Sequence, residues 1–226
     1  MCGRFTYAKE FRELRIRFNL DRDIPLFRPR YNIAPGQEVA VIFNRDGARG
    51  LAMMQWGLVP AWVKDPAIGN RMINARAETL AEKPAFKRLI GKRRCVVPAD
   101  GFYEWRKEGK RKVPMRFRLK TGEPFGFAGL WDRRRPDGNE LQSFTIITTD
   151  ANEFIRPIHD RMPVILTQED EERWLDLELK EPAKLLSLLR PYPPRLMEAY
   201  DVSNPGQLPA QRPAAVHRRA NIRHQA

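Results

Sequence analysis

The stretch Val113-Pro114-Met115-Arg116-Phe117-Arg118-Leu119 alternates apolar and charged side chains toward its end. Successive side chains of a β-strand point to opposite faces, so this alternation predicts a strand with one buried face and one solvent-facing face. Short runs of similar β-rich character, separated by turns, lie around it: Arg94 to Val97, Phe125 to Leu130 and Phe144 to Thr149. The second half of the chain is therefore predicted to be rich in strands.

Strand-like segments also occur in the first half. Glu38 to Phe43 and Leu51 to Trp56 are joined by Asn44-Arg45-Asp46-Gly47, a sequence typical of a hairpin turn. Arg28 to Pro35 predicts extended chain interrupted by prolines, and Gly57 to Asn70 predicts a loop.

Helices are predicted between and after these strands. Ala8 to Asn19 has apolar residues near one helical face, and Ala77 to Ile90 is also helix-like, although Pro84 would split or kink it. Thr167-Gln168-Glu169-Asp170 resembles a capping box that opens another helix, and a further helix is expected after Pro182. No internal repeat or central linker divides the chain.

We therefore expect one α+β domain over residues 1–204. Residues 205–226 form a divergent tail rich in Pro, Gln, Ala and Arg, which is expected to be mobile.

The composition points to an anionic partner. The 226 residues carry 41 Lys and Arg against 28 Asp and Glu, a net charge of +13 with a pI near 10.2. Such a balance is typical of proteins that bind nucleic acid, although a solvated basic surface also explains it. No secretory signal or membrane-spanning run is present, so we expect a cytoplasmic or nucleoid location, or the nucleus in a eukaryote. Two cysteines and three histidines without ligand spacing predict no disulfide, metal or cofactor.

Cys2 is the first candidate for chemistry, because removal of Met1 would leave it with both a free α-amine and a thiol. These groups have ordinary pKa values of about 8 and 8.5, and together they can trap an aldehyde as a five-membered thiazolidine ring. The alternative is that Cys2 is simply a small residue at a frayed chain end.

Two further residues could move protons. His159 is the only histidine before the tail, and the neighbouring Asp160 could orient its ring. Glu104, between Tyr103 and Trp105, is either a partly desolvated general acid or an exposed strand glutamate between buried aromatic residues.

Other candidates fit binding roles or structural ones. Asn74 could orient a substrate or cap the following helix, and Arg4 and Arg76 could bind phosphates. Trp56 and Trp62 could stack on bases or fill a core, and Cys95 fits packing in an apolar strand.

These segments together resemble the SOS-response-associated peptidase (SRAP) family, whose members crosslink to abasic sites in single-stranded DNA. The resemblance covers about residues 2–170, and its motifs occur in the family's order: Met1-Cys2-Gly3-Arg4-Phe5, Arg30 to Gly36, Trp56 to Pro60, Ile73 to Arg76, Ala99 to Trp105 and Ile158 to Pro163. It implies an α+β fold with a β-rich, barrel-like core, flanking helices and a basic DNA-binding groove.

The resemblance also implies roles for individual residues. Cys2 would form the thiazolidine, Glu104 and His159 would transfer protons, and Asn74 would position the chain end or the lesion. Some lyase activity could arise at the imine stage. The residues implied to bind DNA are Arg4, Arg76, Arg161, Trp62, Pro35 and Thr148.

The resemblance implies a repair protein that acts on abasic sites in single-stranded DNA, and we expect it to be a monomer, although the sequence leaves the oligomeric state open. Two alternatives stay open: a thiol peptidase acting on its own amino terminus through Cys2 and His159, and a non-covalent reader of modified or single-stranded DNA. The chain departs from the family pattern after Val202-Ser203-Asn204, where Pro205 and the basic tail follow.

Overall fold

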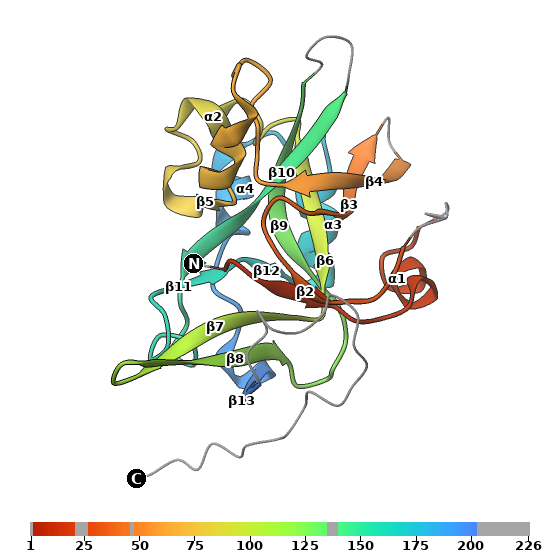
Figure 1. Ribbon diagram of the computed structural model, residues 1–226. Coiled ribbons are helices and arrows are strands. Elements are labelled where there is room, and N and C mark those ends of the chain that lie inside the picture. The colour runs from red at the N-terminus through yellow and green to blue at the C-terminus, as the bar shows by residue number, and fades with distance from the viewer. Residues whose placement is uncertain (1, 21–26, 46–47, 135–139, 203–226) are drawn as a thin grey trace.

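Two β-sheets organise the chain in a computed structural model that describes residues 2–20, 27–45, 48–134 and 140–202 (Figure 1). The first sheet closes into a barrel, in which strands β4, β3, β6, β9 and β10 follow one another and β10 returns to β4. The bounds of these strands are β3 Glu38–Arg45, β4 Ala48–Trp56, β6 Arg94–Ala99, β9 Phe125–Arg134 and β10 Leu141–Asp150. Three short strands extend this sheet: β5 Asn74–Arg76, β11 Arg161–Pro163 and β12 Ile165–Leu166.

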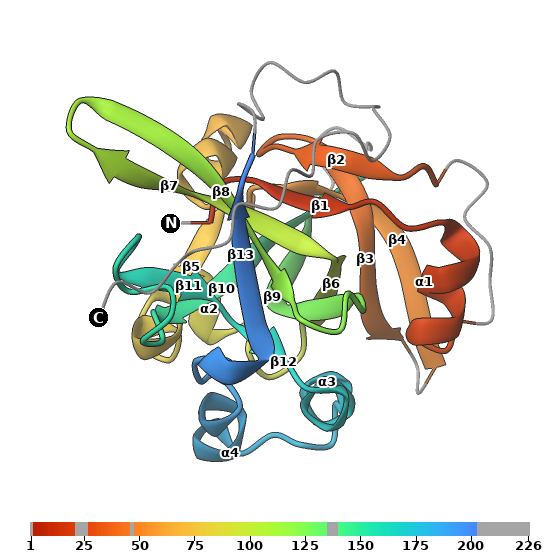
Figure 2. The ribbon, with the colours of Figure 1, turned by 90° about the horizontal axis from the view of Figure 1, so that it is seen from below.

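The second sheet holds the start of the chain. Its order is β13-β8-β7-β1-β2, so the first strand of the sequence is an interior strand. Its members are β1 Phe5–Tyr7, β2 Arg30–Ile33, β7 Gly101–Glu108, β8 Arg111–Leu119 and β13 Met197–Asp201. Figure 2 shows that the hairpin of β7 and β8 extends away from the body of the protein.

Aromatic packing joins the two sheets. The ring of Phe5 on β1 lies 5.1 Å from the ring of Trp56 and 5.8 Å from that of Phe127, both in edge-to-face contact. All three side chains are fully buried. Edge-to-face pairs stabilise a core beyond the effect of area alone, so β1 is held firmly against the barrel.

The strand predictions are confirmed, with longer strands than expected. β3 and β4 pair in register up to Arg45 and Ala48, which confirms the predicted hairpin, although Asp46 and Gly47 of its turn lie outside the described residues. The extended segment before them contains β2. The predicted α+β fold with a barrel-like core is also confirmed; the predicted tail, residues 205–226, lies outside the described residues.

The helix predictions are confirmed in part. The first helix, α1, spans Phe11–Arg17, and α3 spans Gln168–Leu175 with Thr167 as its N-cap, whose hydroxyl accepts a hydrogen bond from the backbone of Asp170. The helix α4, Pro182–Ser187, begins where expected.

The helix predicted over residues 77–90 is split at Pro84, as its sequence allowed, and is much shorter than expected. A 3₁₀ turn spans Ala77–Thr79, and a separate short helix, α2, spans Pro84–Lys87. Proline lacks a backbone N–H and disfavours helical conformation in the residue before it, so Pro84 starts a helix instead of continuing one. The loop after β4 likewise contains a 3₁₀ helix, Pro66–Arg71.

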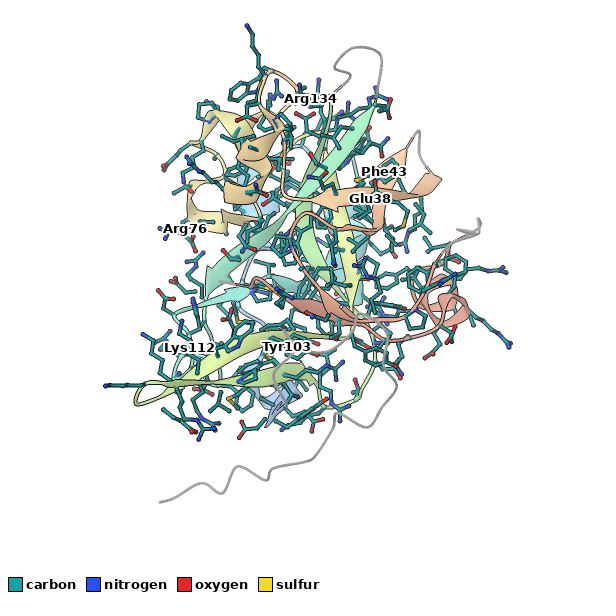
Figure 3. The ribbon with its side chains drawn as sticks, viewed as in Figure 1. Glu38, Phe43, Arg76, Tyr103, Lys112 and Arg134 are labelled. Atoms are coloured by element: carbon teal, nitrogen blue, oxygen red, sulfur yellow. The ribbon has the colours of Figure 1, made fainter. Side chains whose placement is uncertain are left out.

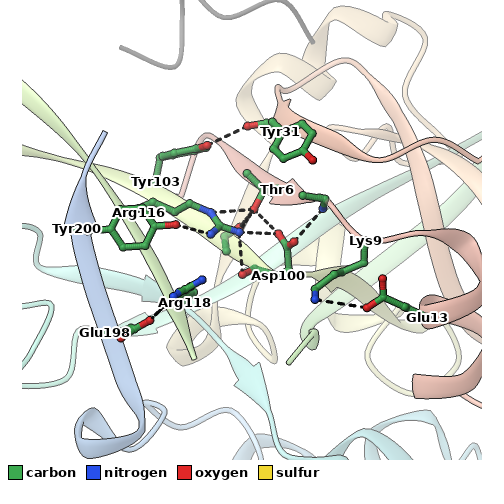
Figure 4. A network of polar contacts seen from close by, with 12 residues as sticks. Thr6, Lys9, Glu13, Tyr31, Asp100, Tyr103, Arg116, Arg118, Glu198 and Tyr200 are labelled. Carbon is green, nitrogen blue, oxygen red and sulfur yellow. Dashed lines mark hydrogen bonds and ion pairs between the residues drawn. The ribbon is translucent and has the colours of Figure 1, made fainter. Parts of the chain in front are cut away.

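Arg116 is also placed differently from the prediction. The alternation along residues 113–119 indicated a solvent-facing arginine, but Arg116 is buried within a polar network (Figure 4). Its guanidinium donates to the Asp100 carboxylate at 2.9 Å, to the Thr6 hydroxyl at 3.0 Å and to the Tyr200 hydroxyl at 2.7 Å. Asp100 in turn accepts from the backbone N–H of Ala8 at 2.9 Å. The network therefore ties β1 to β8 and β13.

Candidate active site at the start of the first strand

Cys2 lies two residues before Arg4, in the segment that leads into β1, and its side chain is fully buried. The side-chain amide of Asn74 donates a 2.9 Å hydrogen bond to the Cys2 carbonyl. Two residues later, the Arg4 carbonyl accepts a 2.9 Å hydrogen bond from the backbone of Tyr103. The interpretation of Cys2 as part of a frayed end is therefore wrong, because neighbours from β5 and β7 hold this segment.

Glu104 on β7 is buried as well, with 3% of its surface exposed. Burial raises the pKa of the Glu104 carboxyl above its ordinary value, and the charge of His159 opposes this rise. The interpretation of Glu104 as an exposed strand residue is therefore wrong. Its neighbour Tyr103 on the same strand is also buried, and the Tyr103 hydroxyl donates to the Tyr31 carbonyl at 2.9 Å.

The negative charge of the Glu104 carboxylate acts on the thiol of Cys2. Burial, followed by the negative charge of Glu104, raises the pKa of the Cys2 thiol well above its ordinary value. The sulfur faces the Arg4 carbonyl at 3.9 Å, as a weak S–H donor would.

A cavity of about 640 Å³ brings Glu104 and His159 together. Its remaining lining residues are Trp105, Lys107, Lys112, Ile158 and Asp160. We call it the Glu104 cavity. The backbone N–H of Arg161 donates a 2.9 Å hydrogen bond to Nδ1 of His159, so Nδ1 is the acceptor and Nε2 carries the proton of the neutral ring. An Asp160 carboxylate oxygen lies 2.9 Å from the same Nδ1, a contact that becomes an ion pair only when the imidazole is protonated. The orientation of His159 by Asp160 therefore stays a prediction.

Asn74 belongs to β5 and does not cap a helix. The residue at the start of the following 3₁₀ turn is Arg76, which makes no capping bond through its side chain. The Asn74 side-chain oxygen is buried and has no hydrogen-bond partner among the described residues. The capping interpretation is therefore wrong, and Asn74 presents both a bound donor and an unused acceptor beside the chain end.

The three candidate arginines differ in their surroundings. Arg4 donates to the side chain of Asn32 at 2.8 Å, and Arg76 is exposed at the end of β5. The Arg161 side chain is only 11% exposed and forms ion pairs with Glu78 at 2.9 Å and with Asp150 at 2.7 Å. Arg161 therefore forms two ion pairs with carboxylates, whereas Arg76 forms none within the described residues, although its charge also lowers the pKa of Glu78.

The other candidates divide between surface and core. Trp62 is 57% exposed, with the guanidinium of Arg88 5.9 Å from its ring centre, while Trp56 is fully buried and donates to the Ile73 carbonyl at 2.8 Å. Trp56 therefore fills the core. Thr148 is buried on β10, so it can shape a channel only through its neighbours, and Cys95 is buried as expected.

Pro35 follows β2 and is half-buried.

Within the described residues, no group of His, Cys, Asp and Glu side chains could hold a metal ion. In the same part of the chain, no helix is long and apolar enough to cross a membrane.

The buried Glu104 carboxylate predicts a stability change with pH. The pKa of the Glu104 carboxyl is raised in the folded state. The stability that this group contributes to the fold is therefore fully present below its pKa in the unfolded chain, about 4.3, and is lost as the pH rises through its pKa in the folded protein. We expect Glu104→Gln to raise the melting temperature at pH 7 more than at pH 4. Glu108→Gln, an exposed glutamate on the same strand, serves as the control and should show no such gain. Equal shifts at both pH values for Glu104→Gln would contradict the prediction.

Comparisons with known proteins identify the family of this chain. The family model described as SOS response associated peptidase (SRAP) matches residues 1–205. The chain is 49% identical to the abasic site processing protein YoqW of Bacillus subtilis, over 90% of this chain and 93% of that protein. It is 35% identical to the abasic site processing protein YedK of Escherichia coli, over 79% and 81% of the two chains. A crystal structure of a protein from Bacteroides thetaiotaomicron superposes with a TM-score of 0.83 at 34% identity, covering 90% of this chain and 93% of that one. This chain therefore belongs to the SOS response associated peptidase family.

Proposed function

We propose that this protein recognises abasic sites in single-stranded DNA and forms a covalent thiazolidine with them through Cys2, after removal of Met1. The observation that carries the proposal is the anchored position of Cys2, with Asn74 on its carbonyl and Glu104 close enough to shift the pKa of its thiol. Relatives named abasic site processing proteins share about half of its sequence, which supports DNA containing abasic sites as the substrate.

The proposed reaction balances with the loss of one water. The amine of Cys2 attacks the aldehyde carbon of the ring-opened deoxyribose, and the aldehyde oxygen leaves as water to give an imine. The sulfur then bonds to the same carbon, while its proton passes to the nitrogen. Because both nucleophiles belong to one residue, the second attack is intramolecular and therefore strongly favoured. The closed ring removes the imine that would otherwise promote strand cleavage by β-elimination.

Glu104 is proposed to move the protons of these steps. Its raised pKa keeps a larger fraction of the carboxyl protonated near neutral pH than in an exposed glutamate. The acid form can protonate the departing oxygen, and the ionised form can accept a proton from the amine. His159 lines the same cavity and is proposed to relay protons during formation or reversal of the link.

The buried thiol favours crosslinking over peptidase chemistry. A cysteine peptidase attacks as a thiolate, but the raised pKa keeps the Cys2 thiol protonated at neutral pH. In the proposed order the amine reacts first, and the protonated imine then supplies a positive charge next to the sulfur. The positive charge of the imine lowers the pKa of the neighbouring thiol, so the thiolate is favoured at the ring-closing step, in which the sulfur attacks the imine carbon.

The lesion and its flanking phosphates are proposed to contact exposed or partly exposed groups around the start of β1. Arg4 and Arg76 are the phosphate ligands proposed first, because Arg161 would have to give up a carboxylate partner to bind one. Exposed Trp62 can stack on an unpaired base, and Pro35 and Thr148 are proposed to shape the channel.

The decisive experiment combines a denaturing gel with intact-mass analysis. Purified protein is mixed with single-stranded DNA carrying one abasic site, beside an undamaged strand of the same sequence. We expect an adduct only with the damaged strand, at the mass of the protein without Met1 plus the DNA minus one water. Absence of the adduct from protein confirmed to lack Met1 would reject the proposal in favour of a non-covalent DNA reader.

A further inference from the structure

The tip of the β7–β8 hairpin carries an unusual pairing of like charges. Lys107 on β7 lies directly opposite Lys112 on β8 in the antiparallel register, and both side chains are exposed. Like charges placed directly across two strands destabilise a hairpin. Lys110 and Arg111 in and after the turn add further positive charge. Such an arrangement is favourable when a negatively charged ligand lies between or beside the lysines.

The lysines differ from the arginines of the same sheet. Arg106 forms ion pairs with Asp201 and with Glu108, and Glu108 is the carboxylate nearest the hairpin tip. Arg118 forms an ion pair with Glu198. Within the described part of the chain, Lys107 and Lys112 form no ion pair or hydrogen bond through their side chains. The acidic residues of this sheet thus pair with Arg106 and Arg118 and leave the two lysines available.

The position of the two lysines connects them to the candidate active site. Both line the Glu104 cavity, together with Glu104 and His159. Figure 3 shows Lys112 and Arg76 on the same side of the molecule, one below and one above the start of β1. A strand of DNA whose sugar reaches Cys2 would therefore leave the site with Arg76 on one side and the hairpin on the other.

We propose that Lys107 and Lys112 form a phosphate-binding clamp for the DNA strand on one side of the abasic site, opposite the side held by Arg76. This inference rests on the proposed function and adds to it a direction for the strand. A flexible lysine suits this role, because the backbone of single-stranded DNA offers separate phosphate charges and not one fixed planar group.

The clamp is tested by binding measurements that do not depend on crosslinking. The probe is single-stranded DNA with a stable abasic analogue that lacks the aldehyde, and affinity is measured by fluorescence anisotropy over a series of salt concentrations. For Lys107→Gln/Lys112→Gln we expect roughly tenfold weaker binding, and a slope of log affinity against log salt that is smaller by about 1.4, because each phosphate contact on single strands contributes about 0.7. The control, Lys92→Gln/Lys120→Gln, removes the same charge from two other exposed lysines and should keep the slope within error.

Strand direction gives a second readout. The analogue is placed at the 5′ end of one oligonucleotide and at the 3′ end of another, so that DNA extends to only one side of the lesion. The double variant should weaken binding of one of these and leave the other unchanged, and Arg76→Gln should show the opposite preference. An unchanged salt slope, or equal losses on both oligonucleotides, would overturn the clamp.

The two proposals can fail separately. If the wild-type protein forms no adduct with a true abasic site but the salt slope still falls in the double variant, the crosslinking function is rejected and the clamp stands. If the adduct forms and the double variant binds like the wild type, only the clamp is rejected.

Discussion

Cys2→Ala is expected to abolish the adduct that survives denaturation and heating, while binding to single-stranded DNA is preserved. Alanine keeps the amino group at the new chain end, so an imine can still form with the aldehyde. It has no sulfur to close the ring, and the imine therefore hydrolyses when the protein is denatured. The alanine side chain also fits the buried site, because it is smaller than cysteine and apolar.

The matched control is the second cysteine. Cys95 is equally buried but lies in the barrel strand β6, so Cys95→Ala should keep the stable adduct while losing some stability to the small cavity it leaves. Reduction with borohydride distinguishes the two stages: it should trap Cys2→Ala as an amine-linked adduct that is absent without the reductant. A heat-stable adduct of Cys2→Ala in the absence of borohydride would disprove the role of the sulfur.

Asp100→Ala is expected to lower the free energy of unfolding by about 3–5 kcal/mol, because it leaves the buried Arg116 guanidinium without its carboxylate. The substitution also removes the acceptor of the Ala8 N–H bond and disturbs the Thr6 hydroxyl. Since both groups belong to the segment around β1, we expect slower adduct formation as well. Urea unfolding followed by fluorescence measures the first effect, and a time course of adduct formation measures the second.

Two control variants distinguish the cost of leaving the buried Arg116 charge unpaired from the cost of losing any ion pair. Glu198→Ala breaks the partly exposed Arg118–Glu198 pair and should cost less than about 1 kcal/mol. The double variant Asp100→Ala/Arg116→Met should be more stable than Asp100→Ala alone, because it removes the uncompensated charge. If Asp100→Ala cost no more than Glu198→Ala, the Arg116 network would not be holding β1 in place.

The alternation of apolar and polar residues along the sequence predicted the strands of this protein well, but it did not predict which polar side chains on those strands are buried. The alternation along residues 113–119 indicated β8 and its buried apolar face. It could not indicate that β1 and β13 also cover Arg116, because their contacts come from residues far away in the sequence. The split of the helix over residues 77–90 has a local cause that the sequence does show, since Pro84 favours the start of a helix and not its middle.

The candidate site was predictable as a set of residues but not as a geometry. Asn74 and Cys2 are 72 positions apart, and the hydrogen bond between them joins β5 of one sheet to the segment before β1 of the other, which no local pattern connects. The strand β7 was not among the predicted strands, so the sequence left both a desolvated and an exposed Glu104 open and could not decide between them. The strong effect of burial on the Cys2 thiol likewise depends on contacts that no motif describes.

The interior position of β1 has a consequence for the dynamics of the chain end. The first residues of most proteins exchange their amide hydrogens with solvent within seconds, because they open without disturbing the core. Here β1 hydrogen-bonds to a strand on each side, and Phe5 packs into the barrel. Its amides can therefore exchange only when the sheet itself opens, and the amino-terminal peptide should rank among the slowest-exchanging segments of the molecule.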